Sequence, residues 1–404
     1  MLQEKKKRLG PLLVVVPSLN TSIEEDGRFR LTQKFVEGMR LTSSLWPGPT
    51  AAAMFLKSSG PSGNLDDVTY NAETLPFELR VINCEPDDIF SSVQDADVVQ
   101  LGGDHRLRAL PNFCERSRIP FVFVSEYTLR TCLQIIFADT FNPVLRMRRA
   151  IWAVRQEYHN RRAVRTASAV QCNGTPTYDI YSKIKTNTLL YFDSRIDKDM
   201  IAEAPSMASR VGSFDGNKPI RLAFSGRLNL MKGADDLIEV ARILQEAKLP
   251  FVMDIFGDGP LNSAMHERIR RHSLLGKVSL KGVLNFSSEL IPYIRDFVDL
   301  FVCCHRQGDP SCTYVETFAC GVPIAGYANE ALVGIIKRES VGWTVPMNDA
   351  AALARKVVEL YNSPEEISRA AWTALAFARR HTFAGELKAR IEQMINLIDN
   401  NKLC

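Results

Sequence analysis

Short apolar runs alternate with longer segments of helical periodicity along most of the chain. The first half contains seven such runs: Leu12–Val16, Ala51–Phe55, Glu78–Ile82, Asp97–Leu101, Pro120–Val124, Ala169–Cys172 and Thr188–Phe192. A second series follows: Ile220–Ser225, Phe251–Phe256, Val278–Lys281, Leu300–Cys304 and Val322–Gly326. Runs this short and rich in Val, Ile and Phe are typical of parallel strands buried on both faces. The intervening helical segments predict right-handed β-α-β crossovers.

A polar stretch separates the two series. Residues Asp193–Pro219 lack strong periodicity and contain Gly212 and Gly216. Because such stretches interrupt regular elements, we expect the domain boundary here. The prediction is an α/β protein with one doubly wound, Rossmann-like parallel-sheet domain over residues 1–197 and a second over 198–383.

Composition and charge are those of an ordinary globular protein. The 404 residues are 46% hydrophobic and 24% charged, and a chain of this length can bury sizeable cores. A net charge of +4 is too small to indicate nucleic-acid binding, and no apolar run approaches the ~18 residues of a spanning helix. The nine cysteines include no C-x-x-C pair. We therefore expect free, buried thiols in a reducing compartment, the cytoplasm, and neither disulfides nor a metal site.

The N-terminus resembles a secretory signal peptide only in part. The basic run Lys5–Arg8 precedes the apolar run Leu12–Val16, which ends at Pro17. This run is too short, no small-x-small cleavage site follows it, and acidic residues begin at Glu24. A buried first strand is the better interpretation.

The segment Pro143–Thr166 has a different pattern. Apolar residues recur there at spacings of three and four, which predicts a helix with one apolar face: Val144, Met147, Ile151, Val154 and Tyr158. Seven arginines occupy the rest, with Glu157 as the only acidic residue: Arg146, Arg148, Arg149, Arg155, Arg161, Arg162 and Arg165. Either the apolar face packs on the core of a solvated helix, or a basic amphipathic helix lies on anionic lipid or beside an anionic acceptor.

Candidate chemistry lies mainly after the strands of the second half, where open α/β sheets bind ligands. The first candidate loop, Ser225–Gly233, follows the predicted strand ending at Ser225. Its glycines permit a tight turn, so Arg227 and Lys232 can hold a diphosphate, the one as a fork and the other as a point charge. The alternative is a surface turn with two solvated cations.

Two further loops are weaker signals taken alone. Phe256–Pro260 and Lys281–Val283 each follow a strand, and their glycines let the backbone approach a flat ligand. The stretch Asp309–Pro323 predicts a helix over about Thr313–Ala319, whose N-terminus offers free N–H groups to a phosphate. Glu316, one turn in, can accept hydrogen bonds from ribose hydroxyls or can simply favour the helix dipole.

These motifs together resemble a known family. The order G-R-L-x-x-x-K-G, G-D-G-P and E-x-F-A-C-G-V-P is similar to the retaining nucleotide-sugar glycosyltransferases of the GT-B fold, family 4 or group 1. The resemblance covers residues 218–380 by motif and the N-terminal half by topology. It implies two domains facing each other across a cleft, with a final helix, about 384–404, packing back on the first.

The resemblance also implies roles for particular residues. Arg227 and Lys232 would bind the donor diphosphate, and Glu316 would bind the ribose. The remaining donor-binding residues would be Gly226, Ser311, Cys312 and Thr313, with Gly257, Gly259, Gly282 and Val283 flanking the nucleobase.

The sequence departs from the family pattern at three places. The family usually has a second Glu eight residues before the ribose Glu, where this chain has Gly308, and Asp309 can reach the donor sugar instead. A His that commonly lies near the transferred sugar is replaced by Glu126, with Asp104 and His105 as alternatives. Of the glycine-rich loop after the first strand, this chain retains only Gly27 beside Arg28. Each of these residues can instead be structural.

The expected activity is a metal-independent, retaining transfer of a hexose-type sugar from a UDP- or GDP-linked donor. The acceptor would be a saccharide or a lipid-linked saccharide, and the enzyme would be cytoplasmic or peripheral at the inner face of the membrane. The nucleotide-sugar is a co-substrate, and no cofactor is expected. Another GT-B enzyme, such as an epimerase or phosphorylase, and a non-catalytic nucleotide-binding protein remain alternatives.

Overall fold

The computed structural model describes residues 8–57, 67–83, 85–212, 214 and 218–402. Its contacts divide the chain into two compact units. The first contains residues up to 126, 154–191 and from 384 onward, and the second contains 127–153 and 192–383. The longer segment of the second unit begins at 192, beside the polar stretch 193–219. The second unit also includes 127–153, a segment that a simple division into halves assigns to the N-terminal domain.

The first unit is built on a sheet of ten strands among the described residues, in the order β10-β9-β8-β7-β1-β4-β2-β3-β5 with β6 beside β4. All pairs are parallel except β2–β3 and β3–β5. The strands are β1 (Leu13–Val16), β2 (Asn20–Ile23), β3 (Phe29–Thr32), β4 (Thr50–Leu56), β5 (Asp67–Tyr70), β6 (Glu78–Ile82), β7 (Val98–Gly102), β8 (Phe121–Ser125), β9 (Ala169–Asn173) and β10 (Thr188–Tyr191).

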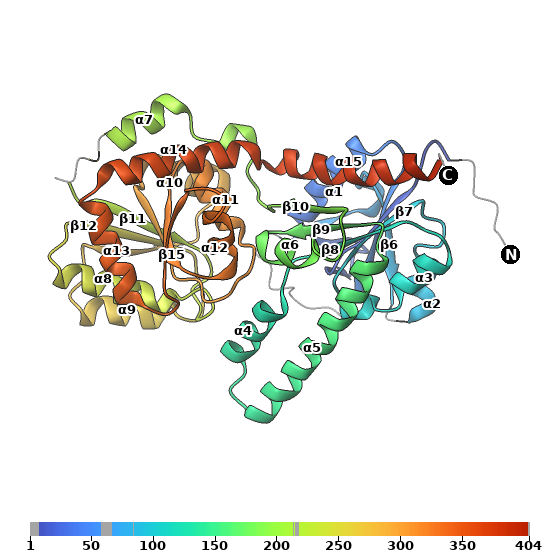
Figure 1. Cartoon of the computed structure of the whole chain (residues 1–404), viewed down its shortest axis with the longest axis horizontal. Coiled ribbons are helices and arrows are strands. Elements are labelled where there is room, and N and C mark those ends of the chain that lie inside the picture. The colour runs from blue at the N-terminus through green and yellow to red at the C-terminus, as the bar shows by residue number, and fades with distance from the viewer. Residues whose placement is uncertain (1–7, 58–66, 84, 213, 215–217, 403–404) are drawn as a thin grey trace. The chain divides into compact units, whose positions relative to one another are not determined.

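Helices lie on both faces of the first sheet (Figure 1), and each face has a hydrophobic core. Leu12, Val14 and Val16 join one core, while Leu13 and Val15 join the other, as the period of two in a strand requires. The helices packed on the first core are α2 (Pro86–Ser91), α3 (Leu110–Arg116), the end of α5 (Pro143–Thr166) and α6 (Thr175–Tyr181). Those on the second are α1 (Gln33–Leu45) and α15 (Phe383–Lys402).

The second unit has a parallel sheet of six strands among its described residues, in the order β13-β12-β11-β14-β15-β16. Their bounds are β11 (Ile220–Ser225), β12 (Phe251–Phe256), β13 (Val278–Gly282), β14 (Leu300–Cys303), β15 (Ile324–Tyr327) and β16 (Gly342–Val345). The helices are α4 (Leu129–Asp139), α7 (Ala204–Gly212), α8 (Ala234–Glu246), α9 (Asn262–Arg271), α10 (Ile291–Phe297), α11 (Cys312–Ala319), α12 (Glu330–Ile336), α13 (Ala350–Tyr361) and α14 (Pro364–Arg380). The strand order reverses between β11 and β14, which is where such sheets bind ligands.

The strands predicted from apolar runs are confirmed, and β6, β11 and β12 have the predicted bounds. The prediction missed β2, β3, β5 and β16. These strands are only four residues long and mix polar with apolar residues; β2, for example, buries Thr21 and Ser22 and exposes Ile23. No continuous apolar run marks them.

The expectation of an irregular stretch over 193–219 is wrong for residues 204–212, which form α7. This helix buries Met207 and Arg210. The Arg210 guanidinium donates to the carbonyl oxygens of Val298, Cys320 and Gly321, acceptors that ordinary helix and strand bonding leaves open. Because Arg210 is polar, it interrupts the apolar pattern on the buried face of α7, and the sequence therefore contains no signal for this helix.

The expected helix over 143–166 is confirmed as α5. The alternative in which its apolar stripe packs on the core is wrong, because all five stripe residues are exposed. The helix instead buries the opposite face, through Ala153, Glu157, Ala163 and Val164.

Two further expectations concern thiols and membranes. Seven cysteines lie in the described part of the chain, where no disulfide joins them; five are buried and two are partly buried. Among the described residues, no helix is long and apolar enough to cross a membrane.

We predict that Arg210→Met destabilises the second unit. The substitution keeps an apolar stem but removes every donor, leaving buried carbonyl groups unsatisfied at a cost of roughly 1–3 kcal/mol each. The free energy of unfolding by urea should fall by at least about 2 kcal/mol. Arg270→Met, on the exposed face of α9, is the matched control. Equal stability of the two variants would show that the buried guanidinium contributes nothing.

Candidate active site

The loops that follow β11, β12 and β13 pack against one another through their backbones. The Gly226 N–H donates to the Phe256 carbonyl at 3.0 Å, and the Gly257 N–H donates to the Gly282 carbonyl at 2.7 Å. At Gly257, where φ is +120°, a Cβ atom would lie 2.0 Å from the carbonyl oxygen of Gly226. Only glycine fits this approach. The structure therefore brings together the glycine loops that the sequence singled out in this unit.

Asp258 holds the second of these loops in shape. Its carboxylate accepts hydrogen bonds from the Gly259 N–H at 2.7 Å and from the Asn262 side-chain amide at 2.9 Å. These bonds lower the pKa of the Asp258 carboxyl. A Cβ at Gly259 would lie 2.5 Å from the Leu228 carbonyl oxygen. The loop after β12 thus supports the loop that carries Arg227, and Arg227 itself is exposed to solvent.

Lys232 and Asp309 form an ion pair. The Lys232 Nζ lies 2.9 Å from Asp309 Oδ2, and both side chains are largely buried. Asp309 Oδ1 is buried without a hydrogen-bond partner among the described residues. Fully buried His305 lies near this pair; burial first, and then the charge of Lys232, holds its pKa well below the usual range. The imidazole is therefore neutral, which leaves Asp309 to balance the lysine charge.

The loop that carries Lys232 is fixed by a glycine. Gly233 precedes α8 in the left-handed conformation, with φ of +63°. A Cβ there would lie 2.0 Å from the Cys304 carbonyl oxygen, at the end of β14. The approach holds the loop after β11 against the strand end that leads to Asp309.

Helix α11 begins at Cys312, one residue before the predicted start, with Ser311 at its N-cap and Thr313 in its first turn. Glu316, in this helix, is 7% exposed. Its Oε1 lies 3.1 Å from Arg195 Nε, and the Arg195 guanidinium lies over the Phe286 ring at 3.8 Å from the centroid. Sequence reasoning missed both partners, because Arg195 lies in the polar stretch and Phe286 lies beyond the predicted loop at Gly282 and Val283.

Gly308 lies where no side chain fits without displacing its neighbours. A Cβ there would come within 3.1 Å of both Glu330 Cβ and Thr131 Oγ1. The Gly308 N–H donates to Gln134 of α4, and Thr128 and Arg130 bind the Glu330 carboxylate. Residues of the 127–153 segment therefore fill the space beside the loop that leads to Asp309.

In the first unit, Asp104 and His105 follow β7, and Glu126 follows the neighbouring strand β8. Asp104 accepts hydrogen bonds from the Arg106 backbone and guanidinium. Burial alone would raise the pKa of Asp104, but these bonds outweigh it and lower the pKa. His105 is half exposed, 3.3 Å from Asp104, and the Glu126 side chain is exposed.

Gly27 and Arg28 lie in the turn between β2 and β3 rather than directly after β1. Gly27 has φ of +79°, and its N–H donates to the Glu24 carbonyl at 2.9 Å. The Arg28 guanidinium pairs with Asp26 at 2.7 Å. Both residues therefore have a local structural role in a hairpin.

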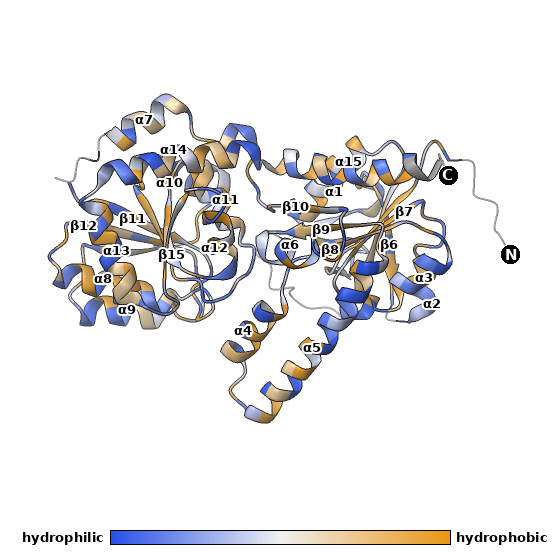
Figure 2. Cartoon of the chain, in the orientation of Figure 1, coloured by the Kyte–Doolittle hydropathy of each residue, from blue (hydrophilic) through white to orange (hydrophobic). Residues whose placement is uncertain are grey.

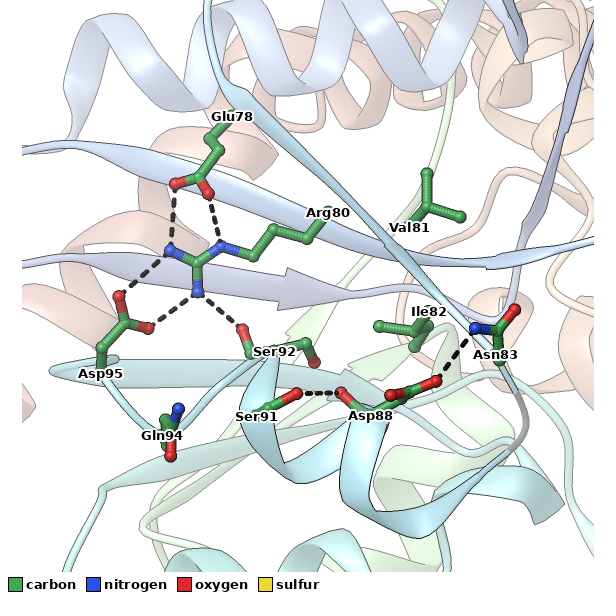
Figure 3. Close-up of a pocket in the computed structure, with 10 residues that line it drawn as sticks. All are labelled: Glu78, Arg80, Val81, Ile82, Asn83, Asp88, Ser91, Ser92, Gln94 and Asp95. Atoms are coloured by element: carbon green, nitrogen blue, oxygen red, sulfur yellow. Dashed lines mark hydrogen bonds and ion pairs between the residues drawn. The ribbon is translucent and has the colours of Figure 1, made fainter.

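A separate hollow of about 360 Å³ lies over β6 and α2 (Figure 3). Its cation is Arg80, whose guanidinium is bound by the carboxylates of Glu78 and Asp95 and by the Ser92 carbonyl. With its donors engaged and acidic neighbours around it, Arg80 is a poor anion site. In the part of the chain that the structure describes, no group of three or more His, Cys, Asp or Glu residues could hold a metal ion.

Comparison with known proteins gives a match over residues 209–376 to the model of "Glycosyl transferases group 1". The chain is 27% identical over 145 residues to a putative colanic acid biosynthesis glycosyltransferase, WcaL, of Escherichia coli K12, covering 34% of this chain and 35% of the relative. It is also 27% identical over 157 residues to the amylovoran biosynthesis glycosyltransferase AmsK of Erwinia amylovora, covering 37% and 38%. The matches span about a third of the length of these curated relatives.

The likeness to solved structures extends over nearly the whole chain. Anabaena HepE in complex with UDP superposes with a TM-score of 0.63 at 14% identity, covering 96% of this chain and 99% of that one. WaaG, a glycosyltransferase involved in lipopolysaccharide biosynthesis, gives 0.57 at 12% identity, covering 94% and 98%. The fold is GT-B. Together with the family match, it supports a group 1 glycosyltransferase.

We predict that Gly233→Ala disrupts the loop that carries Lys232. Forcing a Cβ into a left-handed conformation costs about 1–2 kcal/mol, and the overlap with Cys304 adds roughly 1–3 kcal/mol. Gly276→Ala is the matched control, because Gly276 has φ of +82° and an added Cβ would meet nothing within 4 Å. Urea unfolding measures the difference. Equal destabilisation by the two variants would contradict the close approach at Gly233.

Proposed function

We propose that the chain is a retaining glycosyltransferase that moves a hexose-type sugar from a UDP- or GDP-linked donor to a saccharide or lipid-linked saccharide. The supporting observation is the convergence at one sheet edge of the Gly226, Gly257 and Gly282 loops with the Lys232–Asp309 pair. The reaction would serve cell-surface polysaccharide or glycoconjugate synthesis, consistent with the names of the relatives.

The donor diphosphate would lie against Arg227, Lys232 and the first turn of α11. Lys232 Nζ carries three donor hydrogens, so it can keep its bond to Asp309 and still bind a phosphate oxygen. Asp309 then orients the lysine as well as bordering the sugar. The N–H groups in the first turn of α11 would add a partial positive charge. Cleavage of the glycosidic bond leaves negative charge on the β-phosphate, where these groups would stabilise it.

The nucleoside would lie beside Glu316. Its carboxylate is held by Arg195 through Oε1, and we assign Oε2 to the ribose hydroxyls. The loops at Gly257–Gly259 and Gly282–Val283 would border the base, with Ser311 in the same loop as Asp309. In the first unit, Glu126, Asp104 and His105 are candidates for the acceptor side, and Gly27 and Arg28 are weaker ones because they serve a hairpin turn.

The chemistry proposed needs no metal ion, because two cations and a helix N-terminus would together offset the diphosphate charge. The resemblance to family 4 supports retention at the anomeric carbon. We place the enzyme in the cytoplasm, peripheral at the inner face of the membrane, where a lipid-linked acceptor would be found.

We predict that UDP or GDP raises the melting temperature of the wild-type chain and that Arg227→Ala removes this shift. A ligand that binds only the native state stabilises it in proportion to its occupancy. The panel is UDP, GDP, ADP and their common sugar conjugates, with Arg270→Ala as the matched control. In Arg227→Ala, the turnover rate should fall by a larger factor than the affinity for the nucleotide. Loss of one such contact costs about 2.7–4 kcal/mol in the transition state. Absence of a shift with every nucleotide would overturn the donor site.

We predict that Arg195→Ala weakens nucleoside diphosphate binding by about 10- to 100-fold. The substitution removes a charged hydrogen bond worth roughly 1.5–3 kcal/mol and leaves Glu316 without its guanidinium partner. Arg195→Lys should recover only part of the affinity, because an ammonium cannot stack flat on Phe286. Isothermal titration calorimetry with UDP or GDP measures this, with Arg271→Ala as a surface control. Unchanged affinity in Arg195→Ala would remove Glu316 from the ribose site.

A further inference from the structure

The apolar stripe of α5 is exposed along its length. Its five residues are between 52% and 64% exposed: Val144, Met147, Ile151, Val154 and Tyr158. Trp152, which is 48% exposed, lies about 100° around the helix from Ile151. Figure 2 shows hydrophobic and hydrophilic positions interspersed along α5. Large exposed apolar patches on soluble domains usually mark an interaction surface.

A line of arginines runs beside this stripe. Arg148, Arg155 and Arg162 are seven residues apart, close to two helical turns, so they stay in register along the helix. Each lies four residues after Val144, Ile151 or Tyr158, which puts it one turn further along the same side. All three side chains are exposed. Charge and apolar surface therefore share one face instead of lying on opposite faces.

The only acidic residue of α5, Glu157, lies on the buried face of the helix and not on the exposed surface. Glu157 is 8% exposed, and its carboxylate binds Arg161 at 2.6 Å and the Tyr181 hydroxyl at 2.9 Å. Its charge is thus engaged on the inner side. Residues 129–166 contain eight arginines against two acidic residues, so the exposed side is strongly positive.

The turn that joins α4 to α5 continues the apolar surface. Phe137 is 53% exposed and Phe141 81% exposed. The turn between them is held in place, because Arg146 donates to the Thr140 carbonyl at 2.8 Å and Arg149 donates to its hydroxyl at 2.7 Å. Phe137, near the end of α4, and Phe141, in the turn, form an apolar tip that precedes the stripe in sequence.

We propose that the exposed stripe of α5, its arginine line and the Phe137–Phe141 tip form a docking face for an anionic phospholipid bilayer. Apolar side chains would enter the boundary between headgroups and acyl chains. The arginines would bind headgroup phosphates through their planar forks. Trp152 and Tyr158 are residues that favour the interface, since each joins an apolar ring to a polar group.

The charge of this face favours lipid over a protein partner of ordinary composition. Burial and the charges of Arg108, Arg155 and Arg162 lower the pKa of His159, which lies among them. This surface carries positive charges with apolar side chains between them. It is therefore complementary to an anionic bilayer, in which a layer of phosphates covers hydrocarbon. The proposal adds a partner to the proposed function and uses residues outside the donor site, so each can fail without the other.

The test is co-sedimentation of the full chain with vesicles of phosphatidylcholine alone or mixed with phosphatidylglycerol. The charge variant changes Arg148, Arg155, Arg162 and Arg165, all exposed on α5, to Gln. The matched control changes Arg270, Arg271, Arg355 and Arg369, four exposed arginines elsewhere, to Gln. A third variant changes Met147, Ile151 and Val154 to Ser and keeps every charge.

The wild-type chain and the control variant should both bind anionic vesicles. Their binding should weaken at higher salt, because salt screens the attraction between arginines and headgroups. Each arginine near an anionic surface contributes about five-fold in affinity, so the charge variant should lose roughly several-hundred-fold. The serine variant should also lose binding, and wild-type Trp fluorescence should shift to the blue on binding unless Trp152 is changed to Phe.

Binding that survives the charge variant, or that the control loses equally, overturns the proposal. The proposal is also overturned if light scattering shows that the chain self-associates through this face while it does not bind vesicles. The nucleotide-induced rise in melting temperature of each variant shows that it is folded. Normal vesicle binding without that rise in the wild type would instead contradict the donor site.

Discussion

The candidate site depends on how closely the backbones at the carboxyl ends of β11 and β12 approach each other. Gly226 and Gly257 are in contact at a distance that a Cβ on Gly257 would not permit. Hydrogen bonds from the same residues reach Phe256 and Gly282, so three consecutive strands end in one continuous layer of backbone. Gly233 adds a similar approach to Cys304 on the other side of β11. The fixed backbone sets the position from which a charged side chain such as that of Lys232 extends. Recognition of a diphosphate requires such positioning.

The second constraint is electrostatic. Lys232 and Asp309 come from loops 77 residues apart in the sequence, and each largely buries its charge against the other. A buried lysine alone would be costly, and the neutral His305 beside it supplies no charge. The pair therefore offsets the burial of its two charges and directs the Lys232 side chain before any ligand arrives. Arg195 does the same for Glu316, with its guanidinium held flat on Phe286.

Much of the fold follows from the sequence because buried parallel strands leave an unambiguous signal. Runs such as Phe251–Phe256 are apolar, short and bounded by glycine, and the structure has strands there. Helix α7 and strand β2 escaped because their buried residues are partly polar, and β3, β5 and β16 escaped because each buries at most one residue. The Arg210 guanidinium, for example, donates to the Gly321 carbonyl, and the Thr21 hydroxyl donates to the Arg30 carbonyl. No regular spacing in the sequence indicates these partners. In the site, Lys232 and Glu316 could be selected from motifs, whereas Arg195, Phe286 and Gln134 could not, because only the folded chain brings them near the motif residues.

We expect the loops after β11, β12 and β13 and the first turn of α11 to hold a nucleoside diphosphate. Hydrogen–deuterium exchange, with and without saturating UDP or GDP, tests this expectation in solution. We predict slower exchange in 225–233, 257–261, 282–286 and 309–316, and little change in the segments that line the Arg80 hollow, 78–83 and 88–95. Protection confined to that hollow, or absent from 309–316 while nucleotide is bound, would contradict it.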